Sequence, residues 1–162
     1  MRRLWTLLAS QRIPLDGFIT EEVREDDGRR VGFAIEAITG EKAILAHIEL
    51  PGPPRVGRYG VDVASFERIA LPALAQTDAG VVLIDELGKM ELASAAFRNQ
   101  VQQTFARPTA TVATVQRYRH PFTDALKSRR DVELIQVTMT NRDRLPNELL
   151  RRLTASATHE RS

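Results

Sequence analysis

Two adjacent carboxylates, Asp85 and Glu86, are the residues whose types and spacing most directly suggest chemistry. They follow the apolar run 81–84, which predicts a strand buried on both faces of a parallel sheet. In open α/β sheets, ligands bind outside the carboxyl ends of the strands, so both side chains would lie where water and a substrate can meet. One carboxylate can bind Mg²⁺ there, while the other orients or deprotonates an attacking water.

The residues after this acidic pair decide between two interpretations of it. A strand that ends in two acids can simply precede a helix, because acidic side chains offset the helix dipole. However, the chain continues with Gly88, Lys89, Met90 and Glu91. A generic strand end needs neither a glycine, a lysine nor a third acid at this spacing, so the continuation favours a functional site.

The composition limits the class of protein. The chain has 162 residues, which predicts one domain with a sizeable core, and its 43% hydrophobic and 27% charged content is ordinary for a globular protein. It has no cysteine, which excludes a disulfide framework, a thiolate zinc site and a cysteine nucleophile. The histidines, His47, His120 and His159, have spacings that indicate no metal cluster.

The apolar pattern and the charge indicate the environment of the protein. No apolar run is long enough to span a membrane and the first residues lack the pattern of a signal peptide, so we expect a cytoplasmic protein without a membrane partner. A net charge of +2 with a pI of about 9.4 suits either phosphate-bearing ligands or an arginine-rich solvated surface. The chain lacks interleaved aromatic and basic residues, so we expect no specific nucleic-acid partner.

The periodicity of the sequence predicts the elements that position the acidic pair. It predicts helices over 2–11, 62–76, 94–106, 121–129 and 141–153, and strands over 15–20, 30–38, 42–48, 81–84, 109–115 and 132–137. The last helix would open with a capping box formed by Thr140 and Asp143. From the acidic strand onward, strands and helices alternate, which indicates a mainly parallel sheet. We expect a single domain over 1–153 and a frayed tail over 154–162.

Several stretches resemble the THEP-type nucleoside-triphosphatases, a family of small P-loop NTPases. They are residues 17–24, 30–33, 56–62, 82–92 and 141–143. The stretch around the acidic pair is the most specific, and the resemblance runs in order from about Trp5 to Leu153. It implies an α/β fold of the P-loop NTPase (Rossmannoid) type, with a mainly parallel sheet flanked by helices and a β-hairpin insertion.

The phosphate-binding loop of that family does not occur in this sequence. The family opens with a short strand and a G-x-x-x-x-G-K-[ST] loop whose backbone N–H groups bind phosphates, whereas the first glycine here is Gly17. Residues 2–11 resemble the helix that follows this loop. Either the natural protein is longer, or the domain has lost its loop. We expect the first, because deletion of a central strand leaves a gap comparable in cost with the stability of a whole domain.

The resemblance implies Mg²⁺-dependent hydrolysis of nucleoside 5′-triphosphates, ATP and GTP among them, to diphosphate and phosphate, if the natural protein carries the loop. Asp85 would then bind Mg²⁺, and Glu86 would act as the general base on the attacking water. The alternative is a degenerate domain that binds nucleotide or protein without catalysis. We expect a monomer. The expected nucleotide-binding residues are Val81, Val82, Leu83, Ile84, Asp85, Glu86, Leu87 and Gly88 of the Walker B stretch, with Lys89 and Arg142.

A few further residues have two interpretations each. Arg24 and Arg142 could stabilise charge in the transition state, or be surface arginines. Lys89 could reach phosphate, or pair with Glu91 in a solvent-facing salt bridge. A last group would lie near the same edge of the sheet, where each member could serve the site or be structural: Glu21 and Glu22, His120, Tyr118 and Phe122.

Overall fold

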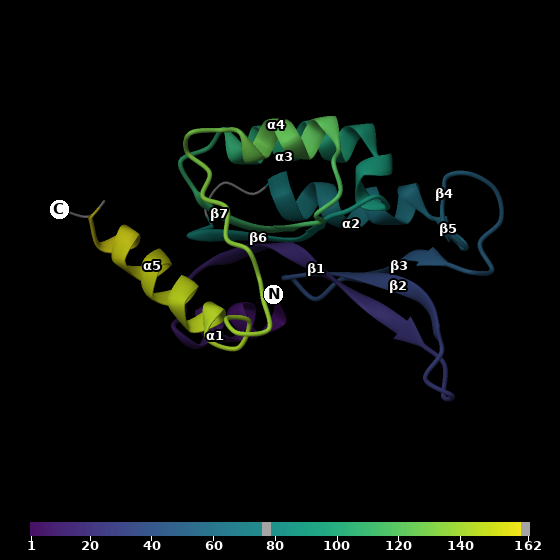
Figure 1. Ribbon diagram of the computed structural model, residues 1–162, viewed down its shortest axis with the longest axis horizontal. Coiled ribbons are helices and arrows are strands. Elements are labelled where there is room, and N and C mark those ends of the chain that lie inside the picture. Colours follow the sequence, from purple (N-terminus) through teal and green to yellow (C-terminus); the bar gives the residue numbers. More distant parts are fainter. Residues whose placement is uncertain (76–78, 160–162) are drawn as a thin grey trace.

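The computed structural model describes residues 1–75 and 79–159 and shows a seven-stranded sheet with helices on both faces (Figure 1). The strands are β1 (Leu15–Arg24), β2 (Arg30–Ala37), β3 (Lys42–His47), β4 (Arg55–Val56), β5 (Tyr59–Val61), β6 (Val81–Leu87) and β7 (Ala110–Val115). The helices are α1 (Arg2–Ser10), α2 (Val63–Ala75), the 3₁₀ turn η1 (Glu91–Ala93), α3 (Ala95–Phe105), α4 (Pro121–Lys127) and α5 (Leu145–His159).

The sheet is mixed. Its strand order is β4-β5-β3-β2-β1-β6-β7, in which β1, β6 and β7 are parallel and the other pairings are antiparallel. The predicted α/β class with a hairpin is therefore confirmed, but parallel pairing is confined to one side of the sheet. The hairpin strands, which were expected as an insertion, form the larger antiparallel side.

Strand β6 lies at the centre of the fold because its side chains are buried on both faces of the sheet. Val82 and Ile84 pack into the core beneath α2 and α3, whereas Val81 and Leu83 pack against the side chains of α1 and α5. In Figure 1, α2, α3 and α4 cover one face of the sheet, and α1 and α5 lie on the other. An apolar run without alternation is what a strand covered on both faces requires.

Two predicted strands are longer in the structure. Strand β1 continues through Glu21 and Glu22 to Arg24, because it pairs with β2 over this length and the two glutamates face solvent or bind arginines. Strand β6 continues through the acidic pair to Leu87, which pairs with Val115 of β7. The acidic residues therefore lie within strand β6, near its carboxyl end, and not in a loop after it.

The last third of the chain differs most from the prediction. Residues 132–137 form no strand, so the predicted strand is wrong. The final helix begins at Leu145 instead of residue 141, because Pro146 has no N–H to donate to an earlier turn and fits only the first turn of a helix. The predicted capping box at Thr140 and Asp143 therefore lies before the helix. The helix continues past the predicted end at residue 153 to His159, and residues 160–162 of the predicted tail lie outside the described residues.

In the described ranges, no helix is both long and apolar enough to cross a membrane.

Candidate active site

The acidic pair lies at the carboxyl end of β6, where the parallel strands β1 and β7 flank it. Asp85 and Glu86 are half-buried, and the register of β6 against β7 is irregular between Ile84 and Leu87. The strand is fixed on both faces by the core described above, so the two carboxylates are held on a rigid element. This arrangement confirms the predicted placement of both residues at the end of a buried strand.

The neighbouring strand β7 and the residue directly after it supply a hydrogen-bond donor to each carboxylate. Thr114 Oγ1 donates to Asp85 Oδ1, and Gln116 Nε2 donates to Glu86 Oε1 at 2.5 Å. Because β6 and β7 are parallel and adjacent, polar residues at the end of one strand stand beside those at the end of the other. Sequence reasoning missed Thr114 and Gln116, although polar residues that end a β-branched strand were a usable signal.

A third carboxylate, Glu91, lies beside the pair. A Cβ atom added at Gly88 would lie 2.7 Å from both Glu86 Oε1 and Glu91 Oε2, so both acids approach the same stretch of backbone. Glu91 is only 4% exposed. Glycine at position 88 leaves room for this arrangement, because an added side chain would make both carboxylates shift.

The surroundings of the acids change their proton affinities. Burial raises the pKa of Glu86, the hydrogen bond from Gln116 lowers it, and the charge of Asp85 raises it, with a net upward shift. Burial raises the pKa of Glu91 to about 8, and the charges of Glu86 and Asp85 add to this effect. A carboxylate with a raised pKa accepts a proton more readily than an ordinary one, as a general base must.

Most of the other predicted residues form ion pairs or hydrogen bonds away from the acidic pair. Glu21 bonds Arg2, and Glu22 bonds Arg30 at 2.5 Å as well as Arg24, so neither glutamate joins the site and neither ends the strand. Arg24 also donates to the carbonyl of Gly28, within the hairpin. This pairing favours the interpretation of Arg24 as a surface arginine.

Arg142 is half-exposed, and the carboxylate it faces is that of Asp143, at 3.9 Å. No hydrogen bond or ion pair given for the described residues links Arg142 to the acidic pair.

The residues that follow β6 and β7 line an open hollow of about 530 Å³ next to the acidic pair. They are Lys89, Leu92, Ala93, Tyr118, Arg119 and His120. Lys89 does not form the ion pair with Glu91 that was one of its two interpretations; its ammonium lies over the ring of Tyr118 instead. His120 caps α4 by accepting a hydrogen bond from the backbone of Phe122, and Phe122 packs against the main core, so both have structural contacts.

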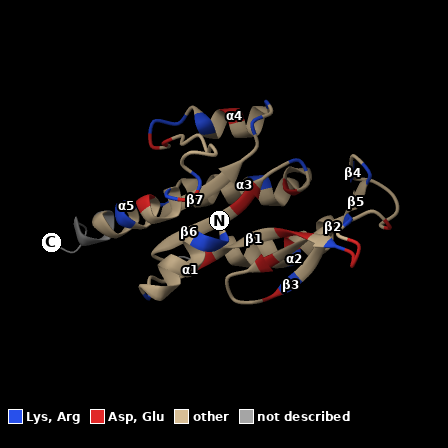
Figure 2. Ribbon diagram, turned by 60° about the horizontal axis from the view of Figure 1, so that its bottom comes forward, with Lys and Arg blue, Asp and Glu red and all other residues tan. Residues whose placement is uncertain are grey.

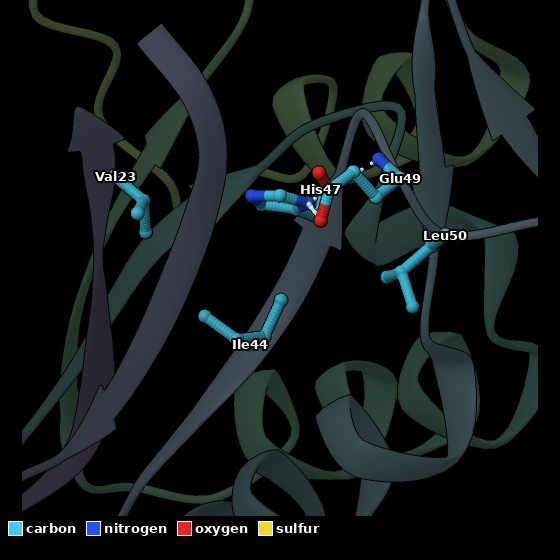
Figure 3. Close-up of a pocket in the computed structure, with 5 residues that line it drawn as sticks. All are labelled: Val23, Ile44, His47, Glu49 and Leu50. Carbon is cyan, nitrogen blue, oxygen red and sulfur yellow. Dashed lines mark hydrogen bonds and ion pairs between the residues drawn. The ribbon is translucent and has the colours of Figure 1, made fainter. Parts of the chain in front are cut away.

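A second hollow lies on the antiparallel side of the sheet, around the imidazole of His47. It measures about 320 Å³ and is also lined by Val23, Ile44, Glu49 and Leu50, as Figure 3 shows. The backbone N–H of Glu49 donates to Nδ1 of His47 at 3.2 Å.

Basic and acidic residues are interspersed along most of the chain, including the β1–β2 hairpin (Figure 2). The acidic pair is therefore distinguished by its placement on β6 and not by a charged face.

Comparison with known proteins identifies the family. A family model described as NTPase matches residues 1–150. A nucleoside-triphosphatase THEP1 of a Thermotoga species (strain RQ2) is 42% identical over 136 residues, which cover 83% of this chain and 78% of the relative. The chain belongs to the THEP-type nucleoside-triphosphatase family. The human cancer-related nucleoside-triphosphatase is 38% identical over 154 residues, which cover 86% of this chain and 80% of that protein.

The fold of this THEP-type chain agrees with that of a solved relative. The crystal structure of THEP1 from the hyperthermophile Aquifex aeolicus superimposes with a TM-score of 0.83 at 34% identity, over 94% of this chain and 91% of that one. The family resemblance predicted from the sequence is therefore confirmed. The relatives named above are nucleoside-triphosphatases, so the family is one of enzymes that act on nucleoside triphosphates.

Proposed function

We propose that the protein hydrolyses nucleoside 5′-triphosphates to diphosphate and phosphate, with Glu86 as the general base. The observation that carries this proposal is the pair of carboxylates at the carboxyl end of β6, each held by a donor from β7. A water hydrogen-bonded to Glu86 would lose its proton to the carboxylate as its oxygen attacks the terminal phosphorus, while the bond to the diphosphate breaks. The hydrogen bond from Gln116 fixes which way the carboxylate points.

The residues present fit a bound Mg²⁺. Mg²⁺ is usually held by one or two carboxylates together with substrate phosphates and water, and not by a dedicated cage of protein ligands. No cluster of three or more acidic, histidine or cysteine ligands occurs among the described residues, whereas Asp85 offers one oriented carboxylate. Asp85 would therefore hold the ion. Bound there, Mg²⁺ neutralises charge on the phosphates of the substrate.

The phosphates of the substrate also need backbone donors. The sequence contains no G-x-x-x-x-G-K-[ST] loop, so hydrolysis is proposed for a form of the protein in which such a loop lies next to these carboxylates. In that form we also propose that Lys89 and the stretch 81–88 contact the nucleotide. Arg142 is half-exposed, so it is a weaker candidate for such a contact.

The test is the variant Glu86→Gln in the protein expressed from its natural gene. Glutamine keeps the shape and the acceptor oxygen for Gln116 but cannot take a proton. We expect kcat for ATP and GTP to fall by about 10²–10⁴-fold, while the affinity for a non-hydrolysable analogue stays within about threefold. The matched control is Glu49→Gln, because Glu49 is 84% exposed and remote from β6.

Two results would contradict the proposal. Normal turnover by Glu86→Gln would remove Glu86 from the mechanism. Nucleotide binding without hydrolysis by the unaltered protein would favour the alternative, a degenerate binding domain.

A further inference from the structure

The hollow at the ends of β6 and β7 has residues that take no part in the proposed proton transfer, and of these only Lys89 has been proposed to contact the nucleotide. It is lined by Lys89, which follows β6, and by Tyr118, Arg119 and His120, which follow β7. Because the two strands are parallel neighbours, the hollow adjoins the acidic pair. Its volume of about 530 Å³ is within the range of small-molecule sites, which is about 300–1,000 Å³.

Lys89 is a cation that pairs with none of the nearby acids. Asp85, Glu86 and Glu91 all lie within four residues of it, yet Lys89 forms no ion pair in the part of the chain that the structure describes. Its Nζ atom lies 4.9 Å from the centroid of the Tyr118 ring, a cation–π contact. The ring holds the ammonium in place on the hollow, and a cation–π contact leaves N–H donors free for a ligand.

Tyr118 packs against His120, and its hydroxyl remains neutral at neutral pH. Its ring meets that of His120 edge-on, with centroids 6.4 Å apart, and its hydroxyl is buried. Burial raises the pKa of Tyr118, and the charges of Glu91 and Glu86 raise it further. The hydroxyl has no hydrogen-bond partner among the described residues.

Arg119 and His120 add donors to the same hollow. The side chain of Arg119 is 94% exposed, and its Nε lies 3.4 Å from Asp124, a carboxylate that is shared with Lys127. In His120, Nδ1 accepts a hydrogen bond from the backbone N–H of Phe122 at 3.2 Å. The neutral ring must then carry its hydrogen on Nε2, which makes that atom a donor. None of the residues given as lining the hollow is an acid.

We propose that this hollow binds a phosphate group, with Lys89 and Arg119 supplying charge and His120 supplying an N–H donor. A ligand of this kind matches two cations and an N–H donor without a lining carboxylate. Stacking of a nucleobase on Tyr118 is disfavoured, because Lys89 already occupies one face of the ring and His120 contacts the ring edge-on. The proposal rests on the proposed function in one respect: the phosphate is either the terminal group of the bound nucleotide or the phosphate that hydrolysis releases.

The test is calorimetric titration of the protein with inorganic phosphate in the absence of nucleotide. We expect saturable binding that Lys89→Gln weakens by about tenfold, which is the loss of one charge-assisted contact. The matched control is Lys42→Gln, because Lys42 is an exposed lysine on β3 that pairs with Glu36 at 3.2 Å, far from the hollow. Equal affinity in Lys89→Gln and the unaltered protein, or no saturable binding at all, would overturn the proposal.

A second pair of variants tests the contribution of Arg119 to the hollow. Arg119→Gln is expected to weaken phosphate binding by about threefold to fivefold, whereas Arg117→Gln removes an exposed arginine that does not line the hollow and is expected to change nothing. A result in which both variants bind phosphate equally well would remove Arg119 from the site. A result in which both weaken binding equally would mean that general surface charge, and not this hollow, attracts the anion.

Repeating the titration with bound nucleotide distinguishes the two sources of the phosphate. If the hollow holds the terminal phosphate, a non-hydrolysable triphosphate analogue will block inorganic phosphate while a nucleoside diphosphate will not. If it holds the released phosphate, neither nucleotide will block it; both results support the site. The titration requires no turnover, so phosphate binding by a protein that fails to hydrolyse nucleotides contradicts only the proposed function. Normal hydrolysis with Lys89-independent phosphate binding contradicts only this site.

Discussion

The three acids of the site have different tasks because their surroundings differ. Asp85 accepts a hydrogen bond from a hydroxyl and Glu86 from an amide, so each is oriented by a donor from β7. Glu91 is almost fully buried beside them, and burial in an apolar environment disfavours its charged form. Because the buried Glu91 is protonated at neutral pH, it adds no second full negative charge next to Glu86.

Glu91 should therefore make the stability of the protein depend on pH. Its folded-state pKa of about 8 lies above the ordinary value of 4.5. A raised carboxyl pKa contributes stability that is fully present below the ordinary value and is lost as the pH rises toward the folded value. We predict that Glu91→Gln, measured by urea unfolding, gains stability relative to the unaltered protein as the pH rises from 5 to 8.

The pH dependence of this difference in stability has an upper limit, and a second variant serves as its control. One group changes the free energy of unfolding by at most about 1.4 kcal/mol per pH unit. Glu49→Gln is the matched control for removing a carboxylate, because Glu49 is 84% exposed. A difference between Glu91→Gln and the unaltered protein that stays constant over this range would show that Glu91 titrates normally in the folded protein.

At the scale of residues, the sequence predicted the acids but not their partners. Asp85 and Glu86 follow an apolar run, and that pattern is local in the chain. Gln116 is thirty positions away from Glu86, and only the pairing of β6 with β7 brings the two together. The salt bridge between Lys89 and Glu91, one of the two interpretations of Lys89, does not form for the same reason, since Tyr118 from the segment after β7 offers Lys89 another partner.

At the scale of elements, the contact between β1 and β6 depends on one glycine. Gly17 pairs with Leu83 in the parallel ladder and has a φ of +108°. A Cβ atom at this position would lie 1.9 Å from the carbonyl oxygen of Leu83. The backbone conformation and the close approach both exclude a side chain. The strand that bears the acidic pair therefore keeps its place only if position 17 is glycine.

We predict that Gly17→Ala destabilises the protein by about 2–4 kcal/mol, because backbone strain and overpacking act together. The matched control is Gly28→Ala, at a glycine that also has a positive φ, +81°, but no atom within 4 Å of an added Cβ. Backbone strain alone should cost about 1–2 kcal/mol there. Thermal or urea unfolding of both variants measures the difference. Equal costs would mean that the approach to Leu83 relaxes freely.

The predicted strand over 132–137 shows where periodicity fails. Its content of β-branched and other apolar residues is typical of a strand, but a strand exists only if another strand supplies its hydrogen bonds. In the described residues β7 pairs with β6 alone, and Leu134 and Val137 are about 60% exposed. Asn141 instead organises a turn, accepting from the N–H of Thr138 and donating to the carbonyl of Gln136.

At the scale of the whole molecule, burial decreases from β6 to β7, the last strand of the sheet in the described structure. The first four residues of β6 are all buried, on both faces, whereas every residue of β7 is only partly buried. The site therefore combines a rigid strand that carries the carboxylates with an outer strand that carries their donors. Motion of β7 would move Thr114 and Gln116 relative to the acids. The orientation of the acids therefore depends on β7, which is less buried than β6.

We predict that native-state hydrogen exchange divides the molecule accordingly. The amides of residues 81–84 of β6 should exchange only with global unfolding, because this part of the strand is paired with β1 on one side and with β7 on the other. The amides of residues 131–144 should exchange at much lower free energy, since their hydrogen bonds are local turns on an exposed segment. The amides of β7 should fall between these groups, because only one edge of that strand is paired in the described structure. Exchange of residues 132–137 as slow as that of β6 would mean that this segment pairs with a strand in solution, as the sequence analysis predicted.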